Sequence, residues 1–225
     1  MTRALGMTLV ELLVGLAVGL FLVAGASGLM ATQLQAQKGL HLELQVQQEM
    51  RAIAALMRRE LGAAGAWGQP DHGVWAADRG KGRPNPFADV DFDAGTQTLR
   101  FAASQSATDP AVPEDDRLDD ADLKAFRLRG STLEFRTDGG RFQPLNDPST
   151  VAIRRFEVQI ERVERSLEAL CPQSCDGWGD CPPRLLTRSL RVSLDAEASQ
   201  DAGVQQRWTW RYRLPADTLS GSCRP

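Results

Sequence analysis

The sequence is poor in the residues on which most enzymes and metal centres depend. Its 225 residues include only two histidines, His41 and His72, and neither lies in a dense polar motif. Histidine is the commonest general base near neutral pH, so its scarcity limits acid–base chemistry. The chain also lacks a phosphate-binding loop, a nucleophile elbow and a helix with metal-ligand spacing. We therefore expect no enzymatic activity and no cofactor.

An excess of positive charge is missing as well. The formal net charge is −3, whereas domains that bind nucleic acid are usually basic. Arginines alternate along the last apolar segment, at Arg207, Arg211 and Arg213, and such a row can contact polyanions such as DNA. Because no other basic cluster accompanies this row, we interpret it as a solvated face of a sheet. Nucleic acid is not an expected partner.

One long stretch has no charge at all. No residue from Leu12 to Gln37 is charged, and Leu, Val, Ala and Gly make up most of residues 12–31. Twenty helical residues cover ~30 Å at ~1.5 Å each, which is the thickness of the hydrocarbon core of a bilayer. The stretch therefore predicts a membrane-spanning helix. A secretory signal peptide is the alternative, with Ala24-Gly25-Ala26 as its small-residue cleavage site.

The residues before this stretch form a short motif. Met1 to Gly6 carries Arg3 and ends in glycine, and Glu11 follows five residues later. An acid inside a membrane helix is a functional candidate by default, because a carboxylate near the bilayer centre costs ~2.5–3.5 kcal/mol. The simpler interpretation of Glu11 is a first-turn acid that interacts favourably with the helix dipole.

The motif resembles the leader of type IV prepilins and type II secretion pseudopilins. The resemblance implies that a membrane prepilin peptidase cuts after Gly6 and methylates the new N-terminus at Met7, where the family usually has Phe. Glu11 then occupies the fifth mature position, which holds the family's glutamate. The resemblance further implies that Glu11 pairs with the α-amino group of Met7 in a neighbouring subunit. Such a pair satisfies two buried charges and sets the register of assembly.

Beyond the membrane stretch the pattern becomes amphipathic. Apolar residues recur three or four positions apart as far as Leu61, and Gly62 and Gly65 follow as helix terminators. The apolar positions are Leu42, Val46, Met50, Ile53, Met57 and Leu61. The segment from Met57 to Gly68, with Arg-Glu-Leu at 59–61, resembles the end of the long helix in PilW-type minor pilins. Pseudopilins of the J type have a related ending.

The remaining residues predict an antiparallel β-domain. Residues 126–135 alternate apolar and polar around Gly130-Ser131, which indicates a two-residue hairpin. Alternation at 156–160, 190–194 and 207–214 predicts strands with one wet face. The expected fold class is α+β and pilin-like, a long N-terminal helix packed on an antiparallel sheet. We expect a cleaved leader over 1–6, a helix over 7–65 with 7–31 in the membrane, and a β-rich periplasmic or extracellular domain over 66–225.

Two acidic segments raise the question of calcium. The D-x-D-x-D spacing of a calcium loop occurs at Asp89, Asp91 and Asp93. However, Ala94 stands at the glycine position of such a loop, and Arg100 stands where the bidentate glutamate belongs. The second segment, residues 109–122, predicts a solvated loop, with calcium binding as the alternative. We expect no metal, and the three aspartates remain the calcium candidates.

The cysteines lie late in the chain, at Cys171, Cys175, Cys181 and Cys223. An even count in a domain exported to an oxidising compartment predicts disulfides, and four cysteines allow three pairings. A bridge from the 171–181 loop to Cys223 would tie down the C-terminus and close a loop of ~40 residues or more, contributing ~3–4 kcal/mol. A four-cysteine zinc site is the alternative, which these spacings fit poorly.

The sequence thus predicts a structural protein. The favoured function is a minor pilin that helps to initiate a type IV pilus at or near its tip, with other minor pilins, the major pilin, the prepilin peptidase and the inner-membrane assembly platform as partners. A minor pseudopilin of type II secretion is the first alternative, and a membrane-anchored periplasmic ligand- or metal-binding domain is the second. The chain would cross the inner membrane once, with its N-terminus cytoplasmic and its β-domain periplasmic, before it enters the pilus or pseudopilus and reaches the cell surface.

Overall fold

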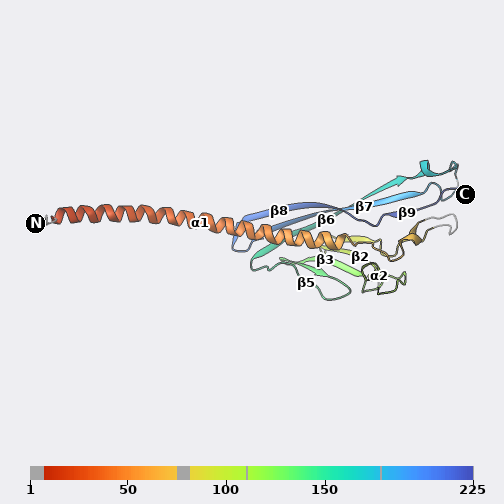
Figure 1. The fold of residues 1–225 in the computed structure, drawn as a ribbon, viewed down its shortest axis with the longest axis horizontal. Helices are drawn as coiled ribbons and strands as arrows, with labels where there is room; N and C mark the ends of the chain where they lie inside the picture. The colour runs from red at the N-terminus through yellow and green to blue at the C-terminus, as the bar shows by residue number, and fades with distance from the viewer. Residues whose placement is uncertain (1–7, 75–81, 110, 178, 225) are drawn as a thin grey trace, which may run out of the picture. The chain divides into compact units, whose positions relative to one another are not determined.

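The computed structural model describes residues 8–74, 82–109, 111–177 and 179–224. The chain divides into two compact units, residues 1–44 and 45–225. One helix, α1 (Leu9–Leu61), contributes to both units (Figure 1). Its length follows from a sequence that is rich in Leu and Ala and has no proline within these bounds.

Within the first unit, α1 exposes apolar side chains on every side. The described side chains from Leu9 to Met30 are all exposed, and this part of the helix is long and apolar enough to cross a membrane. The hydroxyl of Ser27 donates to the carbonyl of Val23 at 2.8 Å, so this polar side chain needs no partner outside the helix. An apolar helix therefore forms where the uncharged stretch predicts one.

Within the second unit, α1 is amphipathic. Five side chains of the predicted stripe have exposed fractions of 1 % or less and form part of the core: Val46, Met50, Ile53, Met57 and Leu61. The helix ends at Leu61, and the amide of Gly62 still donates to the carbonyl of Arg58 at 3.0 Å. Gly65 then takes a φ of +75°, which favours glycine. The predicted end of the helix is confirmed.

The first sheet is antiparallel and follows chain order. Its strands are β1 (Val90–Asp93), β2 (Thr98–Ala102), β3 (Leu123–Arg129), β4 (Thr132–Arg136) and β5 (Gln143–Pro144). Two short helices, η1 (Pro70–Gly73) and α2 (Gln105–Thr108), lie in the connections before β1 and after β2. Strands β3 and β4 pair from Arg129 and Thr132 outward, so Gly130 and Ser131 form the predicted two-residue turn, with Gly130 at a φ of +62°.

The second sheet contains the three longest strands. These are β6 (Val151–Ser166), β7 (Arg184–Ala198) and β8 (Asp201–Arg213), and a short strand, β9 (Thr218–Ser220), pairs with the start of β7. A short helix, η2 (Glu168–Leu170), follows β6. All pairings are antiparallel, as the alternation predicts. The strands thus divide between two sheets, which the alternation alone does not reveal.

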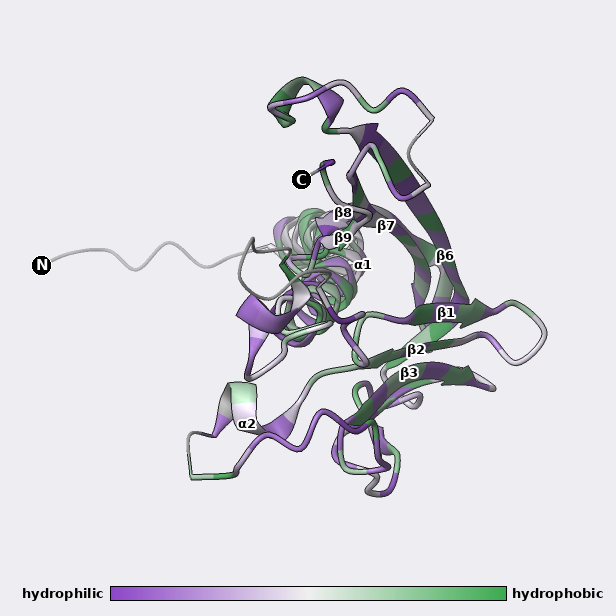
Figure 2. Cartoon of the chain, turned by 90° about the vertical axis from the view of Figure 1, so that its right-hand side faces the viewer, coloured by the Kyte–Doolittle hydropathy of each residue, from purple (hydrophilic) through white to green (hydrophobic). Residues whose placement is uncertain are grey.

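The apolar faces of both sheets turn towards the helix. Figure 2, which looks along α1, shows β6 and β7 on one side of its end and β1 to β3 on another. Within the first sheet, Phe126 of β3 stacks between Phe101 of β2 and Phe135 of β4. Between the sheets, Phe92 of β1 meets Phe156 of β6 edge to face at 5.7 Å. The core of the second unit lies between these three layers.

A buried asparagine joins the two sheets. Asn146 has an exposed fraction of 5 %, and its Oδ1 accepts a hydrogen bond from the amide of Leu133 in β4 at 2.8 Å. Its Nδ2 donates to the carbonyl of Val151 in β6 at 2.7 Å and to that of Ser131 at 3.0 Å. Because all three side-chain bonds are made, the polar group is satisfied within the core.

Candidate functional site

The predicted processing site, Gly6 and Met7, lies outside the described residues. The description starts at Thr8, directly before the first turn of α1. The structure therefore describes Glu11 and the helix that follows, and the cleavage site remains a prediction.

Glu11 forms a reciprocal cap with Thr8. Its Oε2 accepts hydrogen bonds from the amide and the hydroxyl of Thr8, both at 3.3 Å, and its own amide donates to Oγ1 of Thr8 at 3.3 Å. This is a capping box, which satisfies free amides at a helix start. The interpretation of Glu11 as a first-turn acid thus has a structural basis. Its other oxygen, Oε1, accepts no hydrogen bond within the described residues, so the carboxylate can still take a second partner.

The helix surface on both sides of Glu11 in sequence is apolar all round. Large apolar side chains that are more than half exposed continue along the first unit: Leu9, Val10, Leu12, Leu13, Val14, Leu16, Val18, Leu20, Phe21, Leu22, Val23, Leu29, Met30 and Leu34. A helix of this kind must be covered by lipid or by other helices. Glu11 is the one acid in this stretch, at its very start.

The end of α1 is fixed by a nearly buried ion pair. Nζ of Lys124 on β3 lies 3.0 Å from Oε2 of Glu60, and the two side chains are 12 % and 11 % exposed. Nε of Arg59 donates to Oε1 of Glu60 at 2.9 Å. Burial raises the pKa of Glu60, but the hydrogen bonds from Lys124 and Arg59 together hold it below its ordinary value. Glu60 therefore joins the end of the helix to the first sheet.

Gly65 completes this junction. Its amide donates to the carbonyl of Ala102 at the end of β2 at 2.7 Å, and its carbonyl accepts from Nδ2 of Asn85 at 2.8 Å. A Cβ at this position would lie 2.5 Å from the Cβ of Ala216. The segment from Met57 to Gly68 is thus a structural junction in this chain, where the helix meets both sheets.

The acidic segment 109–122 is less solvated than predicted. Oε2 of Glu114 accepts hydrogen bonds from the hydroxyls of Ser104 and Ser106 and from the amide of Gly68, all between 2.6 and 2.7 Å. Asp122 is buried, and burial raises its pKa although two amides donate to it. These acids hold the loop against the domain because they accept hydrogen bonds from its backbone and hydroxyls.

The three calcium candidates, Asp89, Asp91 and Asp93, interact with an arginine and with backbone amides. Arg100 of β2 lies 3.3 Å from Asp91 and 3.9 Å from Asp93 across the hairpin. Asp93 also accepts from the amides of Gly95 and Thr96 in the turn, and these bonds lower its pKa. Asp89 accepts from the amide of Val90. Arg100, which stands at the twelfth position counted from Asp89, therefore forms ion pairs with two of the carboxylates that calcium would need.

The arginine row on β8 is neutralised within its own sheet. Arg207 pairs with Asp195 of β7 at 2.7 Å, Arg213 pairs with Asp217 at 2.7 Å, and Arg211 pairs with Glu161 of β6. Pairing with carboxylates leaves little net charge for a polyanion. This arrangement agrees with the interpretation of a solvated sheet face.

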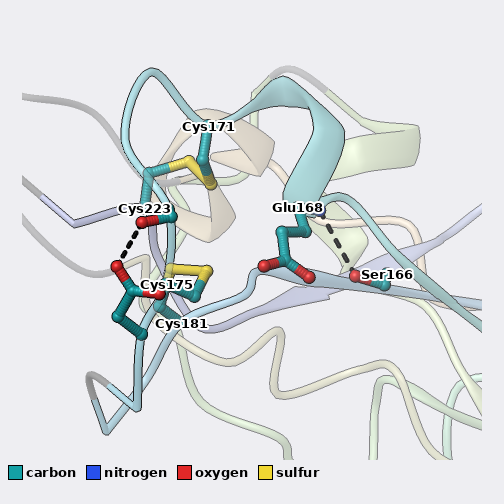
Figure 3. The surroundings of a disulfide bond; sticks show 8 residues. Ser166, Glu168, Cys171, Cys175, Cys181 and Cys223 are labelled. Carbon is teal, nitrogen blue, oxygen red and sulfur yellow. Dashed lines mark hydrogen bonds between the residues drawn. A yellow bond between two sulfur atoms is a disulfide. The ribbon is translucent and has the colours of Figure 1, made fainter.

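The four cysteines form two disulfides. Cys171 is bonded to Cys223, 52 residues away, and Cys175 is bonded to Cys181 (Figure 3). The sulfurs of Cys171, Cys175 and Cys181 lie within 4.8 Å of one another, so the two bridges are neighbours. A thiolate is the sulfur species that binds zinc, and both bridges consume their thiolates. The C-terminus is tied to the loop after β6.

One structurally important residue, Arg188, was missed in the sequence. It lies on the inner face of β7 with an exposed fraction of 7 %, and burial lowers its pKa below the ordinary value. Its guanidinium donates to the carbonyl of Ala88, to the carbonyl of Ala216 at 2.6 Å and to the hydroxyl of Thr218 at 3.2 Å. Its position could have been predicted from the alternation of the strand. Arg188 is two residues before the buried Leu190, so both side chains lie on the same face of β7.

A helix that is apolar over its first half and packs its second half against antiparallel sheets defines a pilin-like protein, a class of structural subunits. Comparison by sequence gives the family. The family described as Prepilin peptidase-dependent protein B matches residues 40–214, more than three quarters of the 225 residues, and the chain belongs to it. No curated protein and no solved structure matches the chain. The matched residues begin beyond the middle of α1, so they do not include Glu11.

Proposed function

We propose that the chain is a minor pilin that is cut after Gly6, methylated at Met7 and built into a type IV pilus at or near its tip. The observation that carries this proposal is the start of α1. There a single carboxylate, Glu11, precedes an apolar surface that only lipid or other helices can cover. The name of the family, which states dependence on prepilin peptidase, supports the same processing.

The chemistry of the helix start supports an assembly role. Cleavage would create an α-amino group with a pKa of ~7.7–8.0, which is cationic at neutral pH. A cation and a carboxylate inside an apolar filament each need a partner. Oε1 of Glu11 accepts no hydrogen bond among the described residues, so it is available to the Met7 amine of a neighbouring subunit.

The proposed setting follows from the order of the two units. Residues 7–31 would anchor the subunit in the inner membrane, with the β-rich residues 66–225 in the periplasm. Two disulfides suit such an oxidising compartment. Once the subunit leaves the membrane, the anchor would pack among the helices of other minor pilins and of the major pilin, delivered by the inner-membrane assembly platform.

Intact-mass measurement of the chain extracted from membranes tests the processing. We expect loss of residues 1–6 and the gain of one methyl group. Gly6→Leu should block both changes, whereas the control Ala4→Leu, which makes the same kind of change two residues earlier in the leader, should leave them intact. Trimming of the Gly6→Leu chain at the same bond would contradict the proposal. Deletion of the gene should reduce surface pili, and loss of protein secretion instead would identify a pseudopilin.

A further inference from the structure

A groove lies between α1 and β8 in the second unit. It has a volume of about 460 Å³ and is lined by Arg51, Ala54, Ala55, Arg58, Arg59, Trp208 and Trp210. The two indole rings meet edge to face at 5.7 Å and are only partly covered. Next to them, the hydroxyl of Tyr212 donates to the carbonyl of Ala54 at 3.2 Å, which holds the strand against the helix. Tryptophan and arginine are the side chains most enriched at the centres of protein interfaces.

The arginines of the groove differ from the other arginines of this sheet. Arg51 and Arg58 are exposed, and no carboxylate in the described part of the chain forms an ion pair with either. The arginines on the opposite face of β8 are each paired, as with Arg207 and Asp195. The groove therefore carries positive charge that the subunit itself does not neutralise.

The strand beside the groove has an open edge. Within the described residues β8 pairs with β7 alone, so its other backbone edge can accept a further strand. No residue from Ala202 to Arg213 is acidic. A second copy of β8 would bring no carboxylate from residues 202–213 to pair with Arg51 and Arg58. An acidic strand would bring carboxylates to Arg51 and Arg58, on the groove side, where the subunit leaves positive charge unneutralised.

We propose that an extended acidic segment of a partner protein adds to β8 as a further strand. Its apolar side chains would lie against Trp208 and Trp210, and its carboxylates would pair with Arg51 and Arg58. The inference goes beyond assembly of a filament and does not depend on it, because the groove lies wholly in the second unit.

A fluorescent peptide of sequence ELEEELE tests the proposal by anisotropy with the full chain in a non-ionic detergent. We expect saturable binding, which Arg51→Gln with Arg58→Gln weakens roughly fivefold, because two exposed ion pairs are lost. The control Arg117→Gln with Arg129→Gln removes the same charge from two exposed arginines elsewhere and should leave the affinity unchanged. The peptide KLKKKLK should not bind. A photo-crosslinker at the central glutamate of ELEEELE should label residues 204–213 or 51–59.

Four outcomes would overturn the proposal. The first is no binding of ELEEELE, and the second is equal weakening in both double variants, which would mean attraction by net charge alone. The third is labelling confined to other residues. The last is self-association of the chain, seen by light scattering, that is lost in the Arg51 and Arg58 variant, because the occupant would then be a second copy.

Discussion

Lys124 on β3 and Glu60 in the last turn of α1 form an ion pair at 3.0 Å across 64 residues of sequence, and both side chains are nearly buried. Such a pair costs desolvation on both sides, and removal of one partner leaves the other charge uncompensated. Because the hydrogen bonds hold the pKa of Glu60 below its ordinary value of 4.5, the pair stabilises the fold above that pH. Its contribution is lost as the pH falls through the lower pKa of the folded state.

Replacement of Lys124 by Met should therefore lower the free energy of unfolding by ~3 kcal/mol at neutral pH. Glu60→Leu combined with Lys124→Met should recover most of this loss, since no buried charge remains. Denaturant unfolding of the full chain in detergent measures both. Below pH 4.5 the wild type should lose stability more steeply than the double variant. Equal pH dependence of the two chains would show that the pair does not carry this effect.

Glu11→Ala should impair assembly while membrane insertion is retained. The change removes a charge from the start of the anchor, so insertion should be no worse, but it leaves an amine unpaired in the filament at a cost of ~3–5 kcal/mol. The chain should accumulate in the inner membrane, and its recovery in sheared pili should fall sharply. Glu11→Gln should be nearly as poor, because an amide cannot neutralise the amine.

Thr8→Ala separates the two roles of Glu11. It removes the hydroxyl of the capping box and keeps the carboxylate. A lost cap costs ~1 kcal/mol, so recovery in pili should stay near that of the wild type. If Thr8→Ala reduces recovery as strongly as Glu11→Ala, the cap explains the defect and the pairing role is refuted.

The two disulfides should contribute unequally to stability. In the chain-entropy model, closing the 52-residue separation contributes ~4 kcal/mol and the six-residue separation ~2 kcal/mol. Cys171→Ser with Cys223→Ser should therefore lower the midpoint of thermal unfolding more than Cys175→Ser with Cys181→Ser. Alkylation of the unreduced wild type should label none of the four. Stoichiometric zinc, with thiols that appear only after chelation, would contradict this assignment.

Arg188→Met should loosen the end of the second sheet. It removes the donors to the hydroxyl of Thr218 and to the carbonyls of Ala88 and Ala216, which are partly buried, so we expect a cost of ~1 kcal/mol for each carbonyl left unpaired. Hydrogen exchange at Leu219 and Ser220 of β9 should accelerate. Arg191→Met, which breaks an exposed pair with Glu161, is the matched control and should change stability by less than ~1 kcal/mol. If the hydrogen exchange of β9 is unchanged in Arg188→Met, Arg188 does not hold this end of the second sheet together.

Periodicity explains which parts of the fold the sequence predicts. The stripe from Val46 to Leu61 and the alternation in β6, β7 and β8 extend over many residues, and burial follows them. Strands β1 and β2 have four and five residues, too few for alternation to distinguish them from loops. The two sheets are bridged by Asn146, whose hydrogen bonds link positions 131, 133 and 151. A single asparagine in the sequence gives no indication of these partners.

The candidate site, too, could be predicted only in part from the sequence. The acid of the capping box is visible in the spacing of Thr8 and Glu11, although only Glu11 was recognised. The hydrogen bonds of Glu114 to Ser104 and Ser106 were not predictable. A dense run of acids has the composition of a solvated loop, and composition does not show which acid accepts hydrogen bonds from the domain. The choice of Cys171 as the partner of Cys223 depends on where the loop after β6 turns, and spacing alone allows three pairings.

The bridge between Cys171 and Cys223 also decides how the subunit bears mechanical load. Strands β7, β8 and β9 all lie between the two bonded residues in sequence. A force that pulls on the chain end passes through the sulfur bridge directly into β6. The three strands are bypassed, so they cannot be peeled from the sheet one after another. Under tension the load would reach the second sheet at β6, while β7, β8 and β9 stay inside the covalently closed loop.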